Sequence, residues 1–507
     1  MNRVLSKICL SLFIISILKA QVSYNDLFDE ELINSNLISL SIGNTGGLIS
    51  SLTNSSFWLI NGERESFVYD QGFVIIGKYN NSLAYGLNQW RSAFSPGPVI
   101  DLKPAVQVTE LNDSALYRIY KITSESKSSD RDVVEWPAKL GASINEAGNP
   151  ILYGNQSLWN IYNLADPNSP LRRYSYSNGI CPIEIHQLTY ATDNKDPNYP
   201  LSNSVFFEYT IINKGINAYD SVFVGIWTDI DFFEIFRNFP AVDTINNLGY
   251  CYSGIDSSLY LKSFPAAVGN VLLYGPSVPS PNDSAYFKGS IKVNFKNLEL
   301  YSFRGLSDEN NKLLSQSSSA EDLWNFALGN DSKGKPLVNY STGKSTRYSF
   351  SGNPATDEGW IFPYYSIGGE GGFIMFSGPF NLAPNDTQWC MFSLIAAIGN
   401  DRFDSIKKLR TDASNLRSLS YNQLVGKTII ERKIEFPEFY YLSQNYPNPF
   451  NSKTKINFEI PVNGVVLIKL YDVLGNEVET IVNREFNKGR YQLEVDGKRL
   501  ASGIYFY

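Results

Sequence analysis

Two pairs of aspartates have a spacing that could hold a metal ion. Asp229 and Asp231 end an alternating apolar run in the string TDID, and Asp193 and Asp196 lie in the loop DNKDPN. Side chains two positions apart on an extended strand share one face, so Asp229 and Asp231 could bind one calcium ion together with loop carbonyls. Neither pair has the regular spacing of an EF-hand loop, and aspartates in turns also cap backbone amides. Calcium is therefore an open hypothesis, and the sequence indicates no other cofactor.

Tryptophan side chains are the second candidates, because a flat indole ring can stack on a sugar. Of the eight tryptophans, Trp136 in EWP and Trp360 in EGW lie beside turn residues. We interpret these two as candidates for a glycan platform. Trp227 lies inside an alternating run, and aromatic side chains commonly fill the cores of β-proteins.

Common catalytic patterns do not occur in the sequence. His186 in PIEIHQLTY is the only histidine, so a Ser-His-Asp triad could use only that residue. No G-x-S-x-G elbow, P-loop or dinucleotide fingerprint is found. A glycosidase needs two facing carboxylates, and the linear spacing of 50 acidic residues singles out no pair. The sequence therefore favours a protein without catalytic activity, with a carboxylate-dependent hydrolase as the alternative.

The composition is typical of a folded, strand-rich and mildly acidic protein. The 507 residues are 43% hydrophobic and 18% charged, with 32 Tyr, 31 Phe, 37 Gly and 24 Pro. Aromatic residues favour strands, while Gly and Pro favour turns. The formal net charge of -7 lacks the basic footprint that nucleic-acid phosphates require, so we expect no nucleic-acid partner.

Residues 1–20 have the pattern of a cleaved secretory signal peptide. Arg3 and Lys7 precede an apolar run from Ile8 to Leu18, and Ala20 is a small residue at the expected cleavage site. This run is too short to cross a bilayer, which needs roughly twenty apolar residues. No later segment is long and apolar enough either, so we expect no membrane span in the mature chain.

Three cysteines follow this leader: Cys181, Cys251 and Cys390. Their spacing matches no zinc pattern. One disulfide with one leftover thiol is an option in an oxidising compartment, and three separate buried thiols are another.

Alternating apolar runs predict strands through most of residues 21–437. The clearest stretch, Val205 to Asp231, contains two runs around Asn213-Lys214-Gly215. This pattern predicts a hairpin or two neighbouring strands of a sandwich. We therefore expect a mainly β fold, with a β-sandwich-type body in one or two lobes.

One or two short helices are also expected in this body. The string Ser318–Glu321 resembles a capping box and predicts a helix that ends at Gly329. A second helix is predicted after Asn400-Asp401, because apolar residues recur there at helical spacing. These residues are Phe403, Ile406, Leu409, Ala413, Leu416 and Leu419.

A charged segment with Pro437, Glu431 to Glu438, predicts a linker to a second domain at residues 438–507. Short alternating runs follow, including Ile456-Phe458-Ile460 and Val466-Ile468-Leu470, with Gly and Asn between them. Such runs are typical of a small Ig-like antiparallel β-sandwich.

Three strings in this second domain resemble the type A C-terminal sorting domain of type IX secretion cargo. They are LSQNYPNPFN, LYDVLGNEV at Leu470–Val478, and KGRYQLEVDGKRLASGIYFY at Lys488–Tyr507. The residues that carry the sorting motif are Asn445, Tyr446, Pro447, Asn448, Pro449, Phe450 and Gly503. Family members usually continue past YFY with a further turn and strand, so we expect the last strand to be missing from this chain.

This resemblance implies a partner and a location. The partner would be the outer-membrane translocon of the type IX system, which reads the sorting domain. The protein would pass through the periplasm and be secreted or attached to the cell surface.

Four strings in the body resemble a recurrent β-rich region of other type IX cargo. They are YDQGFVIIG at Tyr69–Gly77, FSPGPV at Phe94–Val99, GNPATDEGW at Gly352–Trp360 and SGPFNLAPNDTQW at Ser377–Trp389. That region is largely uncharacterised, so the resemblance implies no activity. We therefore expect a non-enzymatic protein that binds a glycan or matrix ligand, with a polysaccharide hydrolase as the alternative and a structural spacer as a third interpretation.

Overall fold

The structure is a computed structural model of the chain, and it divides into two compact units, Met1–Glu431 and Arg432–Tyr507. The described residues are 27–48, 56–60, 63–89, 91–105, 114–166, 181–196, 199–231, 237–254, 265–306, 319–363, 371–431 and 439–507. The predicted signal peptide, residues 1–20, lies outside this set, as does most of the predicted linker. The first unit is called the body below, and the second the tail unit.

A nine-stranded antiparallel sheet is the largest element of the body. Its order is β11 (Tyr120–Thr123), β13 (Gln156–Asn163), β14 (Ile183–Ala191), β15 (Ser204–Asn213), β26 (Thr387–Ile398), β19 (Ala266–Tyr274), β18 (Leu248–Ser253) and β17 (Asn238–Asp243), with β8 (Ser95–Pro96) also paired to β13. A six-stranded antiparallel sheet accompanies it. Its order is β22 (Leu300–Gly305), β25 (Gly371–Leu382), β16 (Tyr219–Ile230), β5 (Asp70–Tyr79), β6 (Ser82–Gln89) and β7 (Arg91–Ser92).

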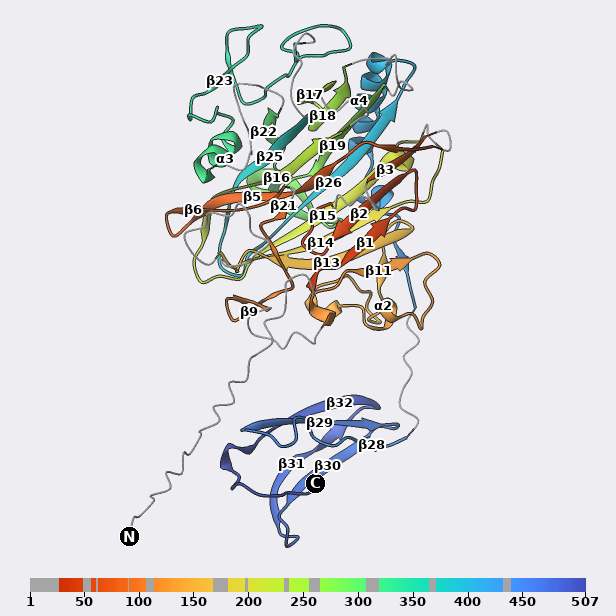
Figure 1. The fold of residues 1–507 in the computed structure, drawn as a ribbon, viewed down its shortest axis with the longest axis vertical. Helices are drawn as coiled ribbons and strands as arrows, with labels where there is room; N and C mark the ends of the chain where they lie inside the picture. The colour runs from red at the N-terminus through yellow and green to blue at the C-terminus, as the bar shows by residue number, and fades with distance from the viewer. Residues whose placement is uncertain are drawn as a thin grey trace, which may run out of the picture. The chain divides into compact units, whose positions relative to one another are not determined.

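The two sheets share one buried core, as in a β-sandwich. Phe207 and Phe392 come from the nine-stranded sheet, and Val224 comes from the six-stranded sheet. The rings of Phe73 on β5 and Tyr209 on β15 lie 4.4 Å apart, centroid to centroid, across this interface. Figure 1 shows the long central strands of the body side by side. The expected mainly β, sandwich-type fold is confirmed.

Small sheets complete the body. They are β1 (Glu30–Ile33) to β4, with β2 (Ile38–Gly43), β3 (Phe57–Ile60) and β4 (Glu63–Ser66), and the pairs β9 (Val99–Ile100) with β10 (Lys103–Pro104), β12 (Ile151–Leu152) with β27 (Thr428–Ile429), and β23 (Leu337–Val338) with β24 (Ser345–Thr346).

The stretch Val205 to Asp231 forms two strands, but they do not make a hairpin. β15 pairs with β14 and β26, whereas β16 pairs with β5 and β25 in the other sheet. Both strands are buried along nearly their whole length, so each needs strand neighbours on both edges and packing on both faces. The chain therefore crosses from one sheet to the other after Asn213, whose amide donates to the carbonyl oxygens of Asn217 and Leu382.

Both predicted helices are present. α4 (Arg402–Ser418) begins after Asp401, whose carboxylate accepts a hydrogen bond from the Asp404 amide at 2.8 Å. α3 (Ala320–Ala327) begins after Ser319, which forms a reciprocal capping box with Asp322. The predicted box was one residue too early, because Asp322 rather than Glu321 occupies the third helical position. Two further short helices, α2 (Arg131–Val134) and α5 (Tyr421–Val425), were not predicted.

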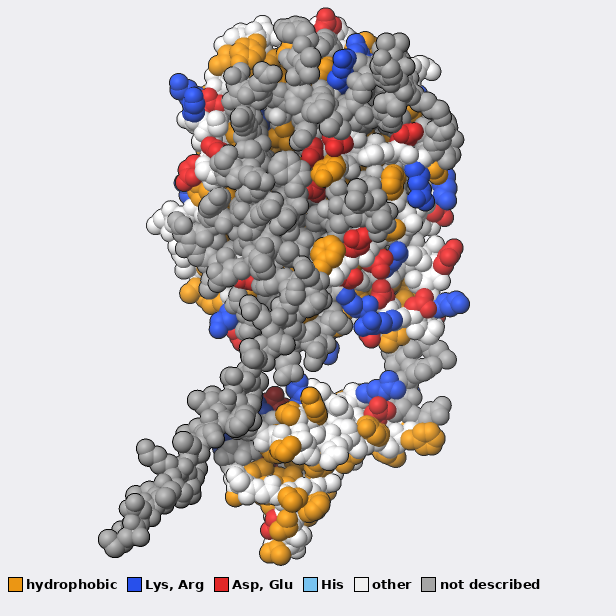
Figure 2. Space-filling view, viewed as in Figure 1, with side chains coloured by type: hydrophobic (Ala, Val, Ile, Leu, Met, Phe, Trp, Pro, Cys, Tyr) orange, Lys and Arg blue, Asp and Glu red, His pale blue; other side chains and the backbone are white. Residues whose placement is uncertain are grey.

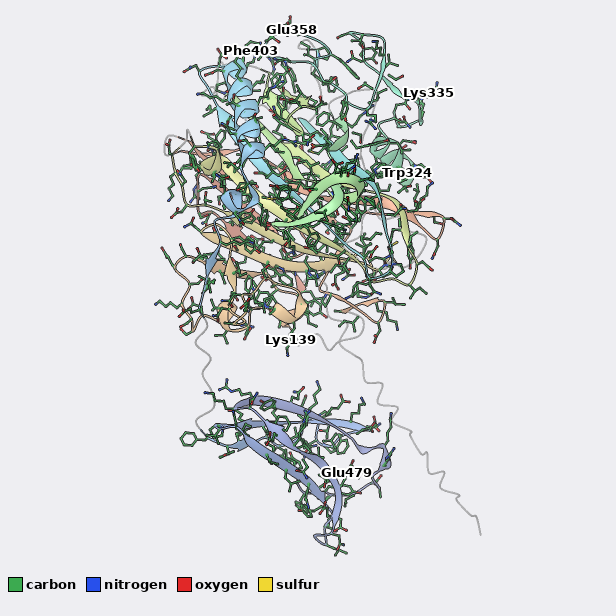
Figure 3. The ribbon with its side chains drawn as sticks, turned by 180° about the vertical axis from the view of Figure 1, so that it is seen from behind. Lys139, Trp324, Lys335, Glu358, Phe403 and Glu479 are labelled. Carbon is green, nitrogen blue, oxygen red and sulfur yellow. The ribbon has the colours of Figure 1, made fainter. Side chains whose placement is uncertain are left out.

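Helices and a β-ribbon cover the outer faces of the sheets. α3 packs on the six-stranded sheet, and α4 packs on β26 and β19 of the nine-stranded sheet. A separate two-stranded ribbon, β20 (Ser277–Phe287) and β21 (Ser290–Asn297), connects β19 to β22. We call this ribbon the strap. Figure 3 shows the green strap in front of the sheet when the molecule is seen from behind.

The tail unit is a small two-sheet structure. β28 (Tyr441–Leu442), β29 (Lys453–Ile460) and β32 (Gly489–Asp496) form one sheet, and β30 (Gly464–Tyr471) and β31 (Glu477–Phe486) form the other. The core between them contains Phe458, Ile460, Ile468, Val482 and Phe486. This arrangement confirms the predicted sheet-rich C-terminal domain. Within the described residues of the chain, no helix has the length and apolar character needed to cross a membrane.

Candidate functional site

The aspartate pair at the end of β16 lies in a largely buried position. Asp229 is in register with Asp70 of β5, and both carboxylates are buried. The nearby Cys251 thiol has a pKa raised by burial and by the charges of Asp229 and Asp231. This places the pair beside β18 rather than in an open loop.

The other aspartate pair is exposed and follows β14. The Asp193 amide donates to the Asn155 side chain at 3.1 Å, and the Asp196 amide donates to Asn194 at 2.9 Å. In the part of the chain that the structure describes, no three His, Cys, Asp or Glu side chains are grouped to hold a metal ion. The calcium hypothesis stays a prediction.

Both tryptophans proposed as sugar platforms are buried. Trp136 is 4% exposed, and its indole nitrogen donates to the Ser143 carbonyl at 3.0 Å. Trp360 is 7% exposed and packs edge-on against Phe350 at 5.5 Å and Tyr340 at 5.1 Å. Their positions beside turns suggested that these side chains would be exposed. They are buried because the loops around them fold onto the same core as α4. Neither ring offers a free face for stacking in this conformation.

The three cysteines are buried and not bridged to one another. Burial raises the pKa of the Cys390 thiol well above its ordinary value, and the Glu208 charge adds to this. A thiol with a raised pKa is a poor nucleophile, so Cys390 is suited to packing rather than catalysis.

Among the residues that the structure describes, a small pocket on the outer face of the nine-stranded sheet brings several ionisable side chains together. Sequence reasoning did not assemble this site. Its walls come from β13, β14, β15, the loop before β12 and the tip of the strap. They are formed by Gly141, Ser143, Trp159, His186, Leu188, Glu208, Thr210 and Lys288.

Strand alternation explains why these residues share one face. On β15, Phe207 and Tyr209 point into the core between the sheets, so Glu208 and Thr210 point outward. The register pairs His186 with Thr210 and Leu188 with Glu208 across β14 and β15. Cross-strand neighbours of this kind lie close together, so the side chains converge without any sequence motif.

Glu208 is the central acid of this site. It is 2% exposed, and its carboxylate accepts hydrogen bonds from the Trp389 indole at 3.0 Å and the Tyr421 hydroxyl at 2.9 Å. Burial raises the pKa of Glu208, while the positive charge of Lys288 and these hydrogen bonds oppose the rise. Glu208 is therefore a carboxyl group whose protonated form is favoured relative to its state in water.

Aromatic and cationic groups surround this acid. Burial raises the pKa of Tyr153 to about 12 and, together with the Glu208 charge, raises that of Tyr421 well above its ordinary value. The Lys427 ammonium lies 5.0 Å from the Tyr421 ring centroid and 5.3 Å from that of Tyr153. Both phenols are thus kept in their neutral, hydrogen-bonding form.

A second carboxylate, Glu184, lies on the same strand as His186. It accepts from the His186 ring nitrogen Nε2 at 2.9 Å and from the Val99 amide at 2.7 Å, and Lys214 lies 3.7 Å away. Burial is the largest single influence and opposes ionisation, but the hydrogen bonds from His186 and Val99 and the charges of His186 and Lys214 together outweigh it and lower the pKa of Glu184. The two carboxylates are therefore shifted in opposite directions.

The strap closes the pocket. Lys288 and Gly289 form its turn, and a side chain at Gly289 would contact the Tyr421 ring. Phe287 packs on Trp389 with their centroids 6.0 Å apart. Burial lowers the pKa of Lys288, and the Glu208 charge opposes this effect. Aromatic packing therefore fixes the tip of the strap beside Glu208, and Lys288 adds a positive charge there.

The motif residues of the tail unit form a compact turn. The Asn445 amide donates to the Thr454 hydroxyl at 3.0 Å, and that hydroxyl donates to the Pro447 carbonyl at 2.9 Å. Tyr446 pairs through its backbone with Lys455, while 78% of its side chain is exposed. The ring of Phe450 lies against Gly497, so tightly that a side chain there would collide with it. Gly503 is exposed near the end of the chain.

The tail unit carries an unusual amount of exposed apolar surface. Nearly half of the large hydrophobic side chains that are exposed in the described residues lie in it. They are Phe439, Tyr440, Tyr441, Leu442, Tyr446, Val462, Val465, Leu467, Val473, Leu474, Val478, Ile504 and Phe506. Figure 2 shows hydrophobic side chains, in orange, spread over this unit. Extensive exposed apolar surface is typical of an interaction region.

Comparison with known proteins identifies this unit. Residues 444–507 match the family of secretion system C-terminal sorting domains, so this unit is a type IX secretion C-terminal sorting domain. The match confirms the interpretation of the NYPNPFN motif and indicates secretion by the type IX system. The resemblance of the body to other cargo stays a prediction.

The body has no comparable assignment. No curated protein matches the chain. Among solved structures, one similar chain is a polysaccharide lyase, with 9% identity and a TM-score of 0.23. That match covers 92% of this chain, and this chain spans 46% of that structure. A likeness of this strength supports no statement about the activity of the body.

Proposed function

We propose that this protein is a type IX cargo that acts outside the cell by binding a glycan or matrix ligand. Its leader is removed during export, and the mature chain passes through the periplasm to the surface or the medium. The sorting domain supports this route, since its family partner is the outer-membrane translocon. The body is the part that performs the extracellular task.

The observation that carries the binding proposal is the outward face of the strap. Ile291 is 63% exposed and Val293 is 68% exposed, and Tyr286 adds an aromatic ring that is 41% exposed. Exposed apolar side chains clustered on one ribbon mark a contact surface more often than isolated ones do. The strap is therefore the proposed ligand-contacting element.

The binding proposal is tested with the full-length secreted chain and a panel of insoluble polysaccharides and matrix proteins. We expect saturable pull-down on at least one of them, and a loss of about tenfold or more in I291D/V293D, because charge on a buried contact is costly. The matched control is Ile245→Asp, an 82%-exposed residue outside the strap. Absence of binding to every member of the panel, or equal losses in I245D, would overturn the proposal.

A polysaccharide hydrolase is the second candidate. The opposite pKa shifts of Glu208 and Glu184 resemble the acid and base assignment that glycosidases use. Against it, Glu208 is 2% exposed, and the pocket beside it has room for about one water molecule, which is too little for a sugar ring to reach the carboxyl group. Release of reducing ends by the wild type, abolished in E208Q, would establish the hydrolase in place of the binding protein.

A further inference from the structure

The pocket beneath the strap contains polar groups that have no direct partner. In the part of the chain that the structure describes, no hydrogen bond or ion pair involves the Lys288 ammonium or the Thr210 hydroxyl, although both line this pocket. His186 uses Nε2 for Glu184, which leaves its Nδ1 facing Gly141. None of these atoms is among the fully buried side-chain atoms that lack a partner in the described residues, so each can be reached from the pocket and can bond a polar molecule that enters it.

The charges in the pocket select against an ion. Lys288 and Glu208 line the same walls, and they do not form a direct ion pair. A cation would meet the ammonium of Lys288, and an anion would meet the carboxyl group of Glu208. A neutral hydroxyl group avoids both conflicts, since it can donate to Glu208 or His186 and accept from Lys288 or Thr210.

The size of the pocket limits what can enter. It has room for about one water molecule between its walls. Gly141 and Gly289 are exposed where the loop before β12 faces the strap, and a side chain at Gly141 would collide with the His186 ring. Only a small terminal group could therefore enter, while the remainder of a larger ligand stayed outside against the strap.

We propose that this pocket binds the primary hydroxyl of a hexose unit, held between Lys288, Thr210 and Glu208 in place of water. This subsite rests on the proposed function, because it assumes that the ligand is a glycan. It specifies which sugars are accepted: those that carry an exocyclic hydroxymethyl group. Trp159, which stands edge-on to His186 at 5.6 Å, forms the apolar wall.

The test uses sugar pairs that differ only in this group. Saturation-transfer NMR with the full-length protein would compare D-glucose with D-xylose, and D-galactose with L-arabinose. We expect at least one hexose to bind about tenfold more tightly than its matching pentose, which corresponds to about 1.4 kcal/mol. Equal binding of both members of each pair, or no binding of any hexose, would overturn the subsite.

Two pocket variants and one control variant test whether the pocket is the place of binding. We expect Lys288→Met and Thr210→Val to reduce the hexose preference about tenfold. Lys292→Met is the matched control, because Lys292 lies on the same strap outside the pocket lining, over the Phe295 ring. Melting temperatures of all three variants establish that each is folded. A preference that survives K288M and T210V in folded protein would overturn the assignment.

The outcomes separate the subsite from the proposed function. Polysaccharide binding that depends on Ile291 and Val293 but shows no hexose preference would leave the binding function and remove the subsite. A hexose preference that depends on Lys288, without binding to any polymer, would keep the subsite and remove the proposed role in adhesion. An ordered water alone in the pocket, with no sugar signal at millimolar concentration, would remove the subsite.

Discussion

The outer face of the nine-stranded sheet and the surface of the sorting domain handle unfavourable groups in opposite ways. The body buries ionisable side chains such as Glu184 and Glu208 and covers the latter with the strap. The sorting domain leaves apolar side chains such as Val465 and Leu467 in solvent. A buried charged group is stable only when it is paired or hydrogen-bonded, and a large exposed apolar surface is typical of a region that binds a partner. In the body, these ionisable groups are therefore buried and hydrogen-bonded, whereas the sorting domain presents apolar side chains that a partner can contact.

This difference depends on packing on both faces of the body sheets. The nine-stranded sheet packs on the six-stranded sheet with one face and on α4, α5 and the surrounding loops with the other. The tail unit has a single core, formed where its two sheets face each other. Its outward faces therefore stay in solvent, and every second residue of each strand is available for a partner.

Removing the sorting domain should have the largest effect. We expect deletion of residues 442–507 from the native gene to abolish delivery to the surface and medium and to leave the body in the periplasm. The melting temperature of the body should change little, because residues 27–431 contain their own core. Cell fractionation with immunoblotting checks this result. Unchanged surface or medium levels of the deleted form would defeat the sorting assignment.

Shortening a buried apolar side chain in the body should lower the stability of the fold. Phe392 is 1% exposed between the two sheets, so Phe392→Ala should lower the free energy of unfolding by about 3–5 kcal/mol. Urea unfolding followed by tryptophan fluorescence measures this directly, because all eight tryptophans lie in the body. The control Ile245→Ala, at an exposed position, should stay within about 0.5 kcal/mol of the wild type. Similar losses in both variants would contradict the proposed core.

Replacing exposed apolar side chains of the sorting domain with charged ones should instead reduce export. We expect the double variant V465D/L467D to reduce extracellular protein several-fold, because charge at a recognition surface opposes its burial. The variant should keep the wild-type melting temperature of the body. The control is Lys455→Asp on the three-stranded sheet, at another exposed position. Full export of V465D/L467D would show that this surface takes no part in recognition.

The opposite pKa shifts of Glu208 and Glu184 should give the smallest effects, which are changes of opposite sign in the pH dependence of stability. Because the folded-state pKa of Glu208 is raised, its contribution to stability is present below the ordinary value of 4.5 and is lost as pH rises. The folded-state pKa of Glu184 is lowered, so its contribution is present above 4.5 and is lost as pH falls. Between pH 4.5 and 7, E208Q should therefore gain stability relative to the wild type, while E184Q should lose it.

Thermal unfolding at a series of pH values checks this pair of predictions. The two difference curves should diverge as pH rises from 4.5. Parallel curves would show that the two carboxylates are in equivalent environments, contrary to the structure. The exposed pair Lys469–Glu477 supplies a control, because K469M should leave the pH dependence of the body unchanged.

Several features were predictable because they depend on neighbouring residues. The cap of α4 is Asp401 and its amide partner Asp404, three residues apart, so a local pattern was sufficient. The turn around Pro447 and the alternation of β29 are similarly local. The short helix α5 was not predicted. Its capping box, Ser420 with Gln423, begins a helix of only five residues, which is too short to show a periodic apolar pattern.

Other features were not predictable because they depend on long-range pairing. The apolar alternation of residues 205–231 predicts two strands. It does not show whether they form a hairpin or belong to two different sheets. Trp136 and Trp360 lie near turns, and nothing in their local sequence shows that their loops fold back onto the core.

The sequence by itself determined the export route, the strand-rich class and the two longer helices. Motifs, alternation and caps are properties of contiguous residues, and their physical causes act within a few positions. Only the tertiary structure decided the pocket. Tyr421 bonds to Glu208 across 213 positions, and Lys288 reaches the same pocket from the strap, which lies between β19 and β22 in the chain. A shift of one residue in the β14–β15 register would turn His186 and Glu208 to opposite faces, so the site exists only through the pairing of the whole sheet.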